Sequence, residues 1–142
     1  MAISLEDAFT FVGQRGHGVL VTLRGDGRPQ LSNILYLPGP DHTVRISVTD
    51  SRAKTRNLRR DPRAALHVTS QDFWEYAVLD GSVGLSAVAE HDDDPVVAEL
   101  VEMYRLARGE HPDWDEFRRS MVSQGRIVAT LSATHAYGQL RD

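Results

Sequence analysis

A basic stretch holds the residues whose types and spacing most clearly indicate chemistry. Residues 51–63 (SRAKTRNLRRDPR) contain six of the chain's 16 lysines and arginines, although the formal net charge is -4. Asp50 and Ser51 are good helix N-cap residues, so we expect a helix from about Ser51 to Arg60, ended by the following Asp-Pro. A helix start attracts anions through its free N–H groups and its dipole. The stretch therefore predicts either a phosphate or carboxylate site or a solvated basic helix face.

Helical geometry divides this stretch into two faces. At about 100° per residue, the side opposite most of the arginines carries Lys54, Asn57 and Leu58. We expect Leu58 to point into the core, which places Lys54 and Asn57 beside an inward-facing cleft. The arginines contact either solvent or an acidic part of a ligand, and they share one face: Arg52, Arg56, Arg59 and Arg60.

Aromatic and amide side chains in predicted strands are further candidates for ligand contacts. Trp74 and Tyr76 alternate along an extended stretch, so they share one side and either wall a planar ring or pack in the core. Asn33 lies among apolar residues, and its amide needs a partner, which is either a ligand carbonyl or a neighbouring loop. Ser47 is a weaker case of the same kind.

Other kinds of catalytic centre are not indicated. The chain has no cysteine, which excludes thiol catalysis and cysteine-based metal sites. Its six histidines form no HxH or HExxH pattern, so we expect no metal site. Neither a phosphate-binding loop nor a GxSxG element is present, and no catalytic side chain can be named. If the protein is an enzyme, its chemistry belongs to a cofactor.

Composition limits the partners and the number of domains. A chain of 142 residues is expected to form one domain over residues 1–142. A pI near 5.8 argues against general nucleic-acid binding. No apolar run approaches the roughly 20 residues of a membrane span, and the N-terminus lacks a signal-peptide pattern. We therefore expect a cytoplasmic protein without nucleic-acid or membrane partners.

Hydrophobic patterns and turn residues predict mostly strands. A helix is expected over residues 4–13, and two further helices are expected from the Asp-Pro at 94–95 to Gly109 and over residues 114–122. The predicted strands are residues 17–23, 30–37, 43–49, 64–70, 74–88, 126–131 and 135–140. This order predicts a mainly β, α+β domain, built as a small antiparallel barrel with helical additions.

Several segments resemble a known family. They are GRPQLSN at 27–33, SRAKTRNL at 51–58 and DPR at 61–63, supported by WEYAV at 74–78, GEHPDW at 109–114 and HAYG at 135–138. Together they resemble the split β-barrel flavin and deazaflavin oxidoreductases of the pyridoxamine 5′-phosphate oxidase-like superfamily, in particular the actinobacterial coenzyme F420-dependent reductases. The resemblance implies a split barrel of six to seven antiparallel strands and a homodimer with the cofactor at the interface.

The resemblance also implies roles for individual residues. Lys54 would contact the cofactor phosphate, in a cradle shared with Arg52, Ala53, Thr55 and Asn57. Other residues would lie beside the ring system or the ribityl chain: Ser47, Val48, Asn33, Trp74 and Tyr76. Coenzyme F420 carries a phosphate and a polyglutamate tail, which suits the additional arginines.

Two departures favour the deazaflavin over FMN. Pyridoxamine oxidases that use FMN typically place Arg and Lys side by side, whereas Ala53 separates Arg52 from Lys54 here. They also carry an Arg-x-His element near the C-terminus, which this chain lacks. The leading prediction is a reductase that transfers hydride from reduced F420 to a small organic acceptor, which the sequence does not identify. The alternatives are an FMN-dependent oxidase or reductase and a non-catalytic F420 carrier.

Overall fold

The computed structural model describes residues 2–141, and Met1 and Asp142 lie outside the described residues. Its helices are α1 (Leu5–Gly13), α2 (Ala53–Arg60), α3 (Pro95–Arg108) and α4 (Trp114–Ser123). Its strands are β1 (His17–Leu23), β2 (Pro29–Leu35), β3 (Leu37–Pro38), β4 (Thr43–Thr49), β5 (Arg63–Thr69), β6 (Tyr76–Leu85) and β7 (Arg126–Gln139).

The strands form one antiparallel sheet that curls into a split barrel. Their order is β2-β1-β5-β6-β7-β4-β3, so β2 and β3 lie at opposite ends of the sheet. A single residue, Tyr36, separates these two strands in sequence, and the sheet must therefore bend until its ends meet. No ladder joins β2 to β4 among residues 2–141, so the barrel stays open between them. The predicted α+β split barrel is confirmed.

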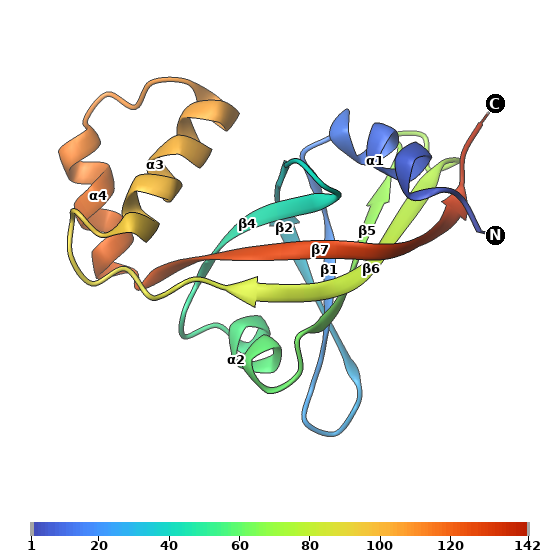
Figure 1. Ribbon diagram of the computed structural model, residues 1–142, viewed down its shortest axis with the longest axis horizontal. Coiled ribbons are helices and arrows are strands. Elements are labelled where there is room, and N and C mark those ends of the chain that lie inside the picture. Colours follow the sequence, from blue (N-terminus) through green and yellow to red (C-terminus); the bar gives the residue numbers. More distant parts are fainter. Residues whose placement is uncertain (1, 142) are drawn as a thin grey trace.

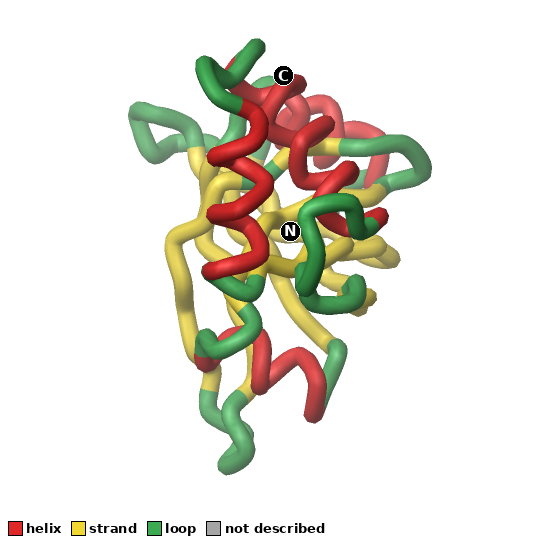
Figure 2. The backbone as a smooth tube through the Cα atoms, turned by 90° about the vertical axis from the view of Figure 1, so that its left-hand side faces the viewer, coloured by secondary structure: helices red, strands yellow, loops and turns green. Residues whose placement is uncertain are grey.

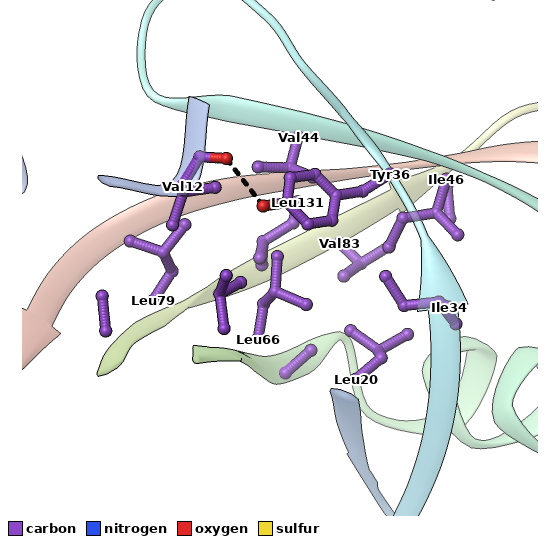
Figure 3. Packing of buried hydrophobic residues seen from close by; sticks show 14 of the residues in the cluster. Val12, Leu20, Ile34, Tyr36, Val44, Ile46, Leu66, Leu79, Val83 and Leu131 are labelled. Carbon is purple, nitrogen blue, oxygen red and sulfur yellow. Dashed lines mark hydrogen bonds between the residues drawn. The ribbon is translucent and has the colours of Figure 1, made fainter. Parts of the chain in front are cut away.

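Alternating apolar residues fill the barrel. Leu20, Leu66, Leu79 and Leu131 are completely buried, and α1 closes one end with Val12 (Figure 3). In the perpendicular view the helical segments lie outside the group of strands (Figure 2). Burial of such side chains contributes about 1.5–3 kcal/mol each, which makes this cluster the main source of stability.

Tyr36 fixes the place where the two ends of the sheet meet. Its hydroxyl donates a hydrogen bond of 2.6 Å to the Val12 carbonyl oxygen (Figure 3). Its backbone N–H donates to the Gly16 carbonyl oxygen at 3.0 Å. Burial raises the pKa of the Tyr36 hydroxyl far above its ordinary value of 10.0, so this hydroxyl remains a donor.

The α3–α4 hairpin stands at the end of the β6–β7 ribbon that lies away from the chain termini (Figure 1). A second apolar cluster, which includes Leu100, Met103 and Met121, holds the hairpin to the sheet. Arg45 of β4 adds two ion pairs to α3, with Glu99 at 3.2 Å and Glu102 at 3.3 Å.

The boundaries of several elements differ from the sequence-based predictions. Helix α2 begins at Ala53, two residues later than expected, and its N-cap is Arg52, without a side-chain hydrogen bond. The expected cap residue Asp50 instead pairs with Arg59 at 2.5 Å. Two predicted final strands are one strand, β7, with Thr134 as an extra residue opposite the step from Asp80 to Gly81 of β6.

Smaller differences concern the remaining strands. The stretch predicted at 30–37 is divided into β2 and the short β3, because Tyr36 carries the bend between them. The stretch predicted at 64–70 begins and ends one residue earlier, and the one predicted at 74–88 is shorter at both ends. Among residues 2–141, no helix has the length and the apolar character needed to cross a membrane.

Candidate functional site

A cleft of about 480 Å³ lies in the opening between β2 and β4. Residues 33–35 of β2 form one wall and residues 47–49 of β4 form the other. Three cationic side chains complete the lining: Arg52 and Lys54 from the start of α2, and Arg126 from the start of β7. The missing ladder between two strands therefore coincides with a concentration of positive charge.

The start of α2 is fixed against β4 from the inside. The Thr55 hydroxyl, which is fully buried, donates to the Thr49 carbonyl oxygen at 2.8 Å. The Arg52 N–H donates to the same oxygen at 3.1 Å, and Leu58 packs in the core as expected. Within the described chain, no protein acceptor is found for the backbone N–H groups of residues 53 and 54. These two donors at the helix start are available to an anion.

The three cations of the cleft lack a neutralising carboxylate among the described residues. Burial, reinforced by the charges of Arg52 and Arg126, lowers the pKa of Lys54 below the ordinary lysine value. Burial and the charge of Arg52 likewise lower the pKa of Arg126. Both shifts mean that positive charge is unfavourable here without a counter-ion. A bound anion would remove this penalty.

Arg126 is positioned by contacts with the turn before β7 and with strand β4. Its Nε donates to Gln124 Oε1 at 2.9 Å, and its Nη1 approaches the Ser47 carbonyl oxygen at 3.5 Å. Arg126 was not among the residues predicted from the sequence. The only signal was a single arginine directly before the mostly apolar run of residues 127–131, at the start of a predicted strand.

The arginine face of α2 is less available than the cleft. Arg59 pairs with Asp50, and Arg56 donates to the Ser51 carbonyl oxygen at 2.8 Å. Arg60 makes two longer contacts of 3.4 Å, with the Leu23 carbonyl oxygen and with Asn57 Oδ1. The side chains of this face therefore have partners within the protein, whereas those of Arg52 and Lys54 have no hydrogen bond or ion pair among residues 2–141.

The predicted site residues divide into two groups around α2. Five of them border the cleft: Asn33, Ser47, Val48, Arg52 and Lys54. Ala53 is the half-buried first residue of α2, and Thr55 has the structural bond to Thr49. Asn57 does point inward, but it does not flank the cleft with Lys54 as expected. Its amide nitrogen donates to Thr22 Oγ1 at 3.1 Å and to Gln30 Oε1 at 2.6 Å, which makes it a buried link between α2 and the sheet.

Within a single chain, Trp74 and Tyr76 do not border this cleft. Trp74 is 66% exposed on the connection between β5 and β6. Tyr76 begins β6 and stacks on His67, with ring centroids 5.5 Å apart. Along the chain, strand β5 lies between α2 and both aromatic residues. Their contact with a cofactor stays a prediction, and within one chain they share no cleft with Lys54.

Backbone groups of β4 also face the cleft. The side chain of Val48 is buried in the core, and its N–H and C=O point toward Ile127 of β7, so Val48 offers no polar group to a ligand. The carbonyl oxygens of Ser47 and Thr49 are bonded by Arg126 and by the start of α2, respectively. The N–H and C=O of one residue in an antiparallel strand point to the same side. The Ser47 N–H therefore also points toward the open edge.

The arrangement suits an anionic group attached to a flat molecule. Two arginines, one lysine and two helical N–H groups supply donors of the kind that bind phosphate. The opposite part of the cleft has Ile34 and Leu35 beside the Asn33 amide, which offers apolar contact and one polar anchor. The donor set thus fits a phosphorylated ring cofactor.

Known proteins share this architecture. The family model described as pyridoxamine 5′-phosphate oxidase matches residues 5–139. An F420 reductase is 21% identical, with a TM-score of 0.67 over 90% of this chain and 94% of that one. A conserved hypothetical protein of Mycobacterium tuberculosis is 20% identical, with a TM-score of 0.73 over 97% and 85%. The heme storage protein HutZ of Vibrio cholerae is 14% identical, with a TM-score of 0.68 over 95% and 94%. At such identities these structures establish the fold.

Proposed function

The chain belongs to the pyridoxamine 5′-phosphate oxidase family, and on that premise we propose that it is a coenzyme F420-dependent reductase. It would transfer hydride from the reduced deazaflavin to a small organic acceptor. The observation that carries the proposal is the uncompensated positive charge of Arg52, Lys54 and Arg126 in the cleft between β2 and β4. The similar fold of an F420 reductase supports the choice of cofactor.

Each part of the cleft has a task in this proposal. The three cations and the N–H groups at the start of α2 bind the phosphate, which fixes one end of the cofactor. The Asn33 amide and the main chain of β4 orient the ring, and Leu35 shields it from water. The bound reduced deazaflavin supplies a two-electron hydride donor. The protein's own contribution is mainly orientation and exclusion of water.

The choice of F420 over FMN rests on the departures from FMN-binding relatives noted in the sequence. Ala53 stands between Arg52 and Lys54, and the Arg-x-His element is missing. Titration of the purified protein with F420 and, separately, with FMN tests the choice. We expect saturable binding of F420 and much weaker binding of FMN. Tight FMN binding without F420 binding would replace the proposal with the second candidate, an FMN-dependent oxidase or reductase, which the family name favours.

Turnover distinguishes an enzyme from a non-catalytic F420 carrier. Reduced F420 is mixed with the protein and with quinones, nitroaromatics, enones or tetrapyrroles, and reoxidation of the cofactor is followed by absorbance. We expect at least one class to be reduced. Binding of F420 without reduction of any of them would favour the carrier.

We also propose a homodimer in which the second copy covers the open side of the cleft, in a cytoplasmic protein. Leu31 and Leu35 of β2 are 62% and 64% exposed on the outer face of the sheet, and Leu35 also borders the cleft. A second copy on this face would bury both leucines and could bring Trp74 and Tyr76 to the partner's cofactor. Sedimentation should show a dimer, and Leu31→Glu should dissociate it. A monomeric wild-type protein that still binds F420 would refute this arrangement alone.

A further inference from the structure

The outer face of strands β2, β1, β5, β6 and β7 carries little charge. The pairing between these strands places the outward side chains in three rows that cross the sheet. The rows are Leu35, His17, Thr69, Tyr76 and Gln139, then Asn33, Val19, His67, Val78 and Tyr137, and then Leu31, Val21, Ala65, Asp80 and His135. Only Asp80 is an acid in these rows, and none of the residues is a lysine or an arginine. In a chain with 25% charged residues, this depletion is typical of a surface that a partner covers.

Two histidines of this face adjoin the same cavity. His17 and His67 both line a space of about 470 Å³ on strands β1, β2 and β5. Among residues 2–141, neither imidazole has a hydrogen bond or an ion pair, and His67 is stacked on Tyr76. The carboxylate of the face is not available to them, because Asp80 Oδ2 lies 3.2 Å from His135 Nδ1. Protonation of His17 or His67 would therefore add a positive charge without a counter-ion.

The other charged groups at the borders of this face are engaged elsewhere. The guanidinium of Arg15 lies over an aromatic ring of α1, 3.6 Å from its centroid. Arg63, the next outward residue of β5, pairs with Asp61 at 2.8 Å. Arg141 pairs with the two carboxylates of the connection between β5 and β6, at 2.7 and 3.8 Å. Tyrosine hydroxyls are uncharged in acid and at neutral pH. The charge of the three rows therefore depends on the histidines.

Histidine is the side chain that changes its charge between about pH 5 and 8. Above this range the three rows carry only the negative charge of Asp80. Below it His17 and His67 become cations, and a two-fold interface would bring the same residues of both chains together. Burial of cations without partners is costly, so such an interface is favourable only while these imidazoles are neutral.

We propose that His17 and His67 make the association of two copies dependent on pH, a step that rests on the homodimer proposed above. The copies associate through this face when both imidazoles are neutral, and they separate when the imidazoles are protonated. A face with almost no charge does not repel its own copy, which makes a second copy of this chain a suitable partner. The second copy would cover the cleft in the proposed dimer, so acid would also open the cofactor site.

The sign and the size of the effect follow from proton binding. Separate chains bind more protons than the dimer does, so a falling pH favours separation. If association releases one proton from each chain, the dissociation constant of the dimer rises about 100-fold for each pH unit below the range in which histidine titrates. If both histidines of each chain release a proton, the rise is steeper.

Sedimentation equilibrium of the protein without cofactor, at constant ionic strength, measures this dissociation constant. We expect the constant at about pH 5.5 to be at least about 100-fold higher than at about pH 8, with an unchanged circular dichroism spectrum. A dimer of equal affinity at both pH values would overturn the role of the histidines and leave the homodimer intact. A monomer at both pH values would overturn the dimer together with its pH dependence.

Glutamine variants locate the effect, because glutamine is polar and stays neutral. In the double variant His17→Gln/His67→Gln, the dissociation constants at the two pH values should agree within about threefold. His91→Gln is the control away from the sheet, since His91 is exposed before α3. His135→Gln is the control on the same face, where Asp80 compensates the charge. Both controls should keep the wild-type pH dependence, and its loss in either control, or its persistence in the double variant, would contradict the assignment.

These measurements are independent of the proposed reaction because no cofactor is present. A pH-dependent dimer that does not bind F420 would refute the reductase and support the role of His17 and His67. A protein that binds F420 and shows no pH-dependent association would do the opposite.

Discussion

Replacing Arg126 with glutamine should weaken the binding of a phosphorylated cofactor without weakening the fold. The side chain is half-buried, and its pKa is lowered by burial and by Arg52. In the free protein its charge is therefore unfavourable. Glutamine keeps much of the stem and can still donate toward the Ser47 carbonyl oxygen. The free energy of unfolding should stay within about 0.5 kcal/mol of the wild-type value, or rise.

The expected loss of affinity is that of one charge-assisted hydrogen bond. Such bonds contribute about 1.5–3 kcal/mol, which corresponds to a dissociation constant about 10- to 150-fold higher. Lys54 binds the same phosphate in our proposal, so the effects of Arg126→Gln and Lys54→Ala should not add. The difference from wild type should also shrink with added salt, because ions screen the remaining charges.

Fluorescence titration with F420 and urea unfolding give the two free energies. Arg59→Gln is the matched control, since Arg59 is an exposed arginine already paired with Asp50. The exposed ion pair that this variant loses contributes up to about 1 kcal/mol of stability. We expect the affinity of Arg59→Gln for F420 to remain within about twofold of the wild-type value. Equal losses of affinity in both variants would refute the distinction between cleft and arginine face. A large loss of stability in Arg126→Gln with unchanged affinity would show that Arg126 is structural.

Three other variants test the site and the fold. The pKa of Lys54 lies below the ordinary 10.5, so its charge should be lost as the pH rises through that lowered pKa. In pH-dependent titrations the wild-type protein should lose cofactor affinity over this range, whereas Lys54→Arg should keep it. Tyr36→Phe should lower the free energy of unfolding by about 0.5–1.5 kcal/mol in urea, because the bond from its hydroxyl is lost while the Arg15 N–H still donates to the Val12 carbonyl oxygen; an unchanged midpoint would contradict this. Hydrogen bonds from Ser70, Arg141 and the Trp74 N–H lower the pKa of Asp72 to about 2. This carboxylate therefore contributes stability above the ordinary pKa of 3.8, and the contribution is lost as the pH falls toward 2. Asp72→Asn should melt earlier than wild type at pH 7 and equally at pH 2, and a constant difference would exclude this carboxylate as the cause.

Periodic patterns were sufficient to predict most of the fold. The run at 17–23 alternates between buried and outward residues and is β1, and the Pro at 62 ends α2 as expected. Sequence patterns failed to predict structure where pairing between segments distant in sequence determines it. Strand β7 continues through residues 132–134, which look irregular in sequence, because β6 pairs with it on both sides of the bulge. The bend at Tyr36 depends on bonds to Val12 and Gly16, which a local window does not contain.

Prediction of the site succeeded for residues near the basic stretch and failed for partners distant in sequence. Lys54 and Arg52 border a cleft, as helix position and charge indicated. Asn57 has the expected orientation, but Thr22 and Gln30 occupy its amide, and neither is near it in sequence. In the sequence, Arg126 follows Lys54 at a distance of more than half of the chain length. Only the order of strands in the sheet, with β7 beside β4, places Arg126 in the cleft.

The outward-pointing main chain of β4 has a consequence for how such a site is found by mutation. The Ser47 N–H is a donor that no substitution other than proline removes, and Val48 can change only at the expense of the core. An alanine scan would therefore report the cationic side chains and miss this part of the site. Amide hydrogen exchange would reveal it, because the Ser47 N–H should exchange quickly in the free protein and become protected once a ligand lies along the strand edge.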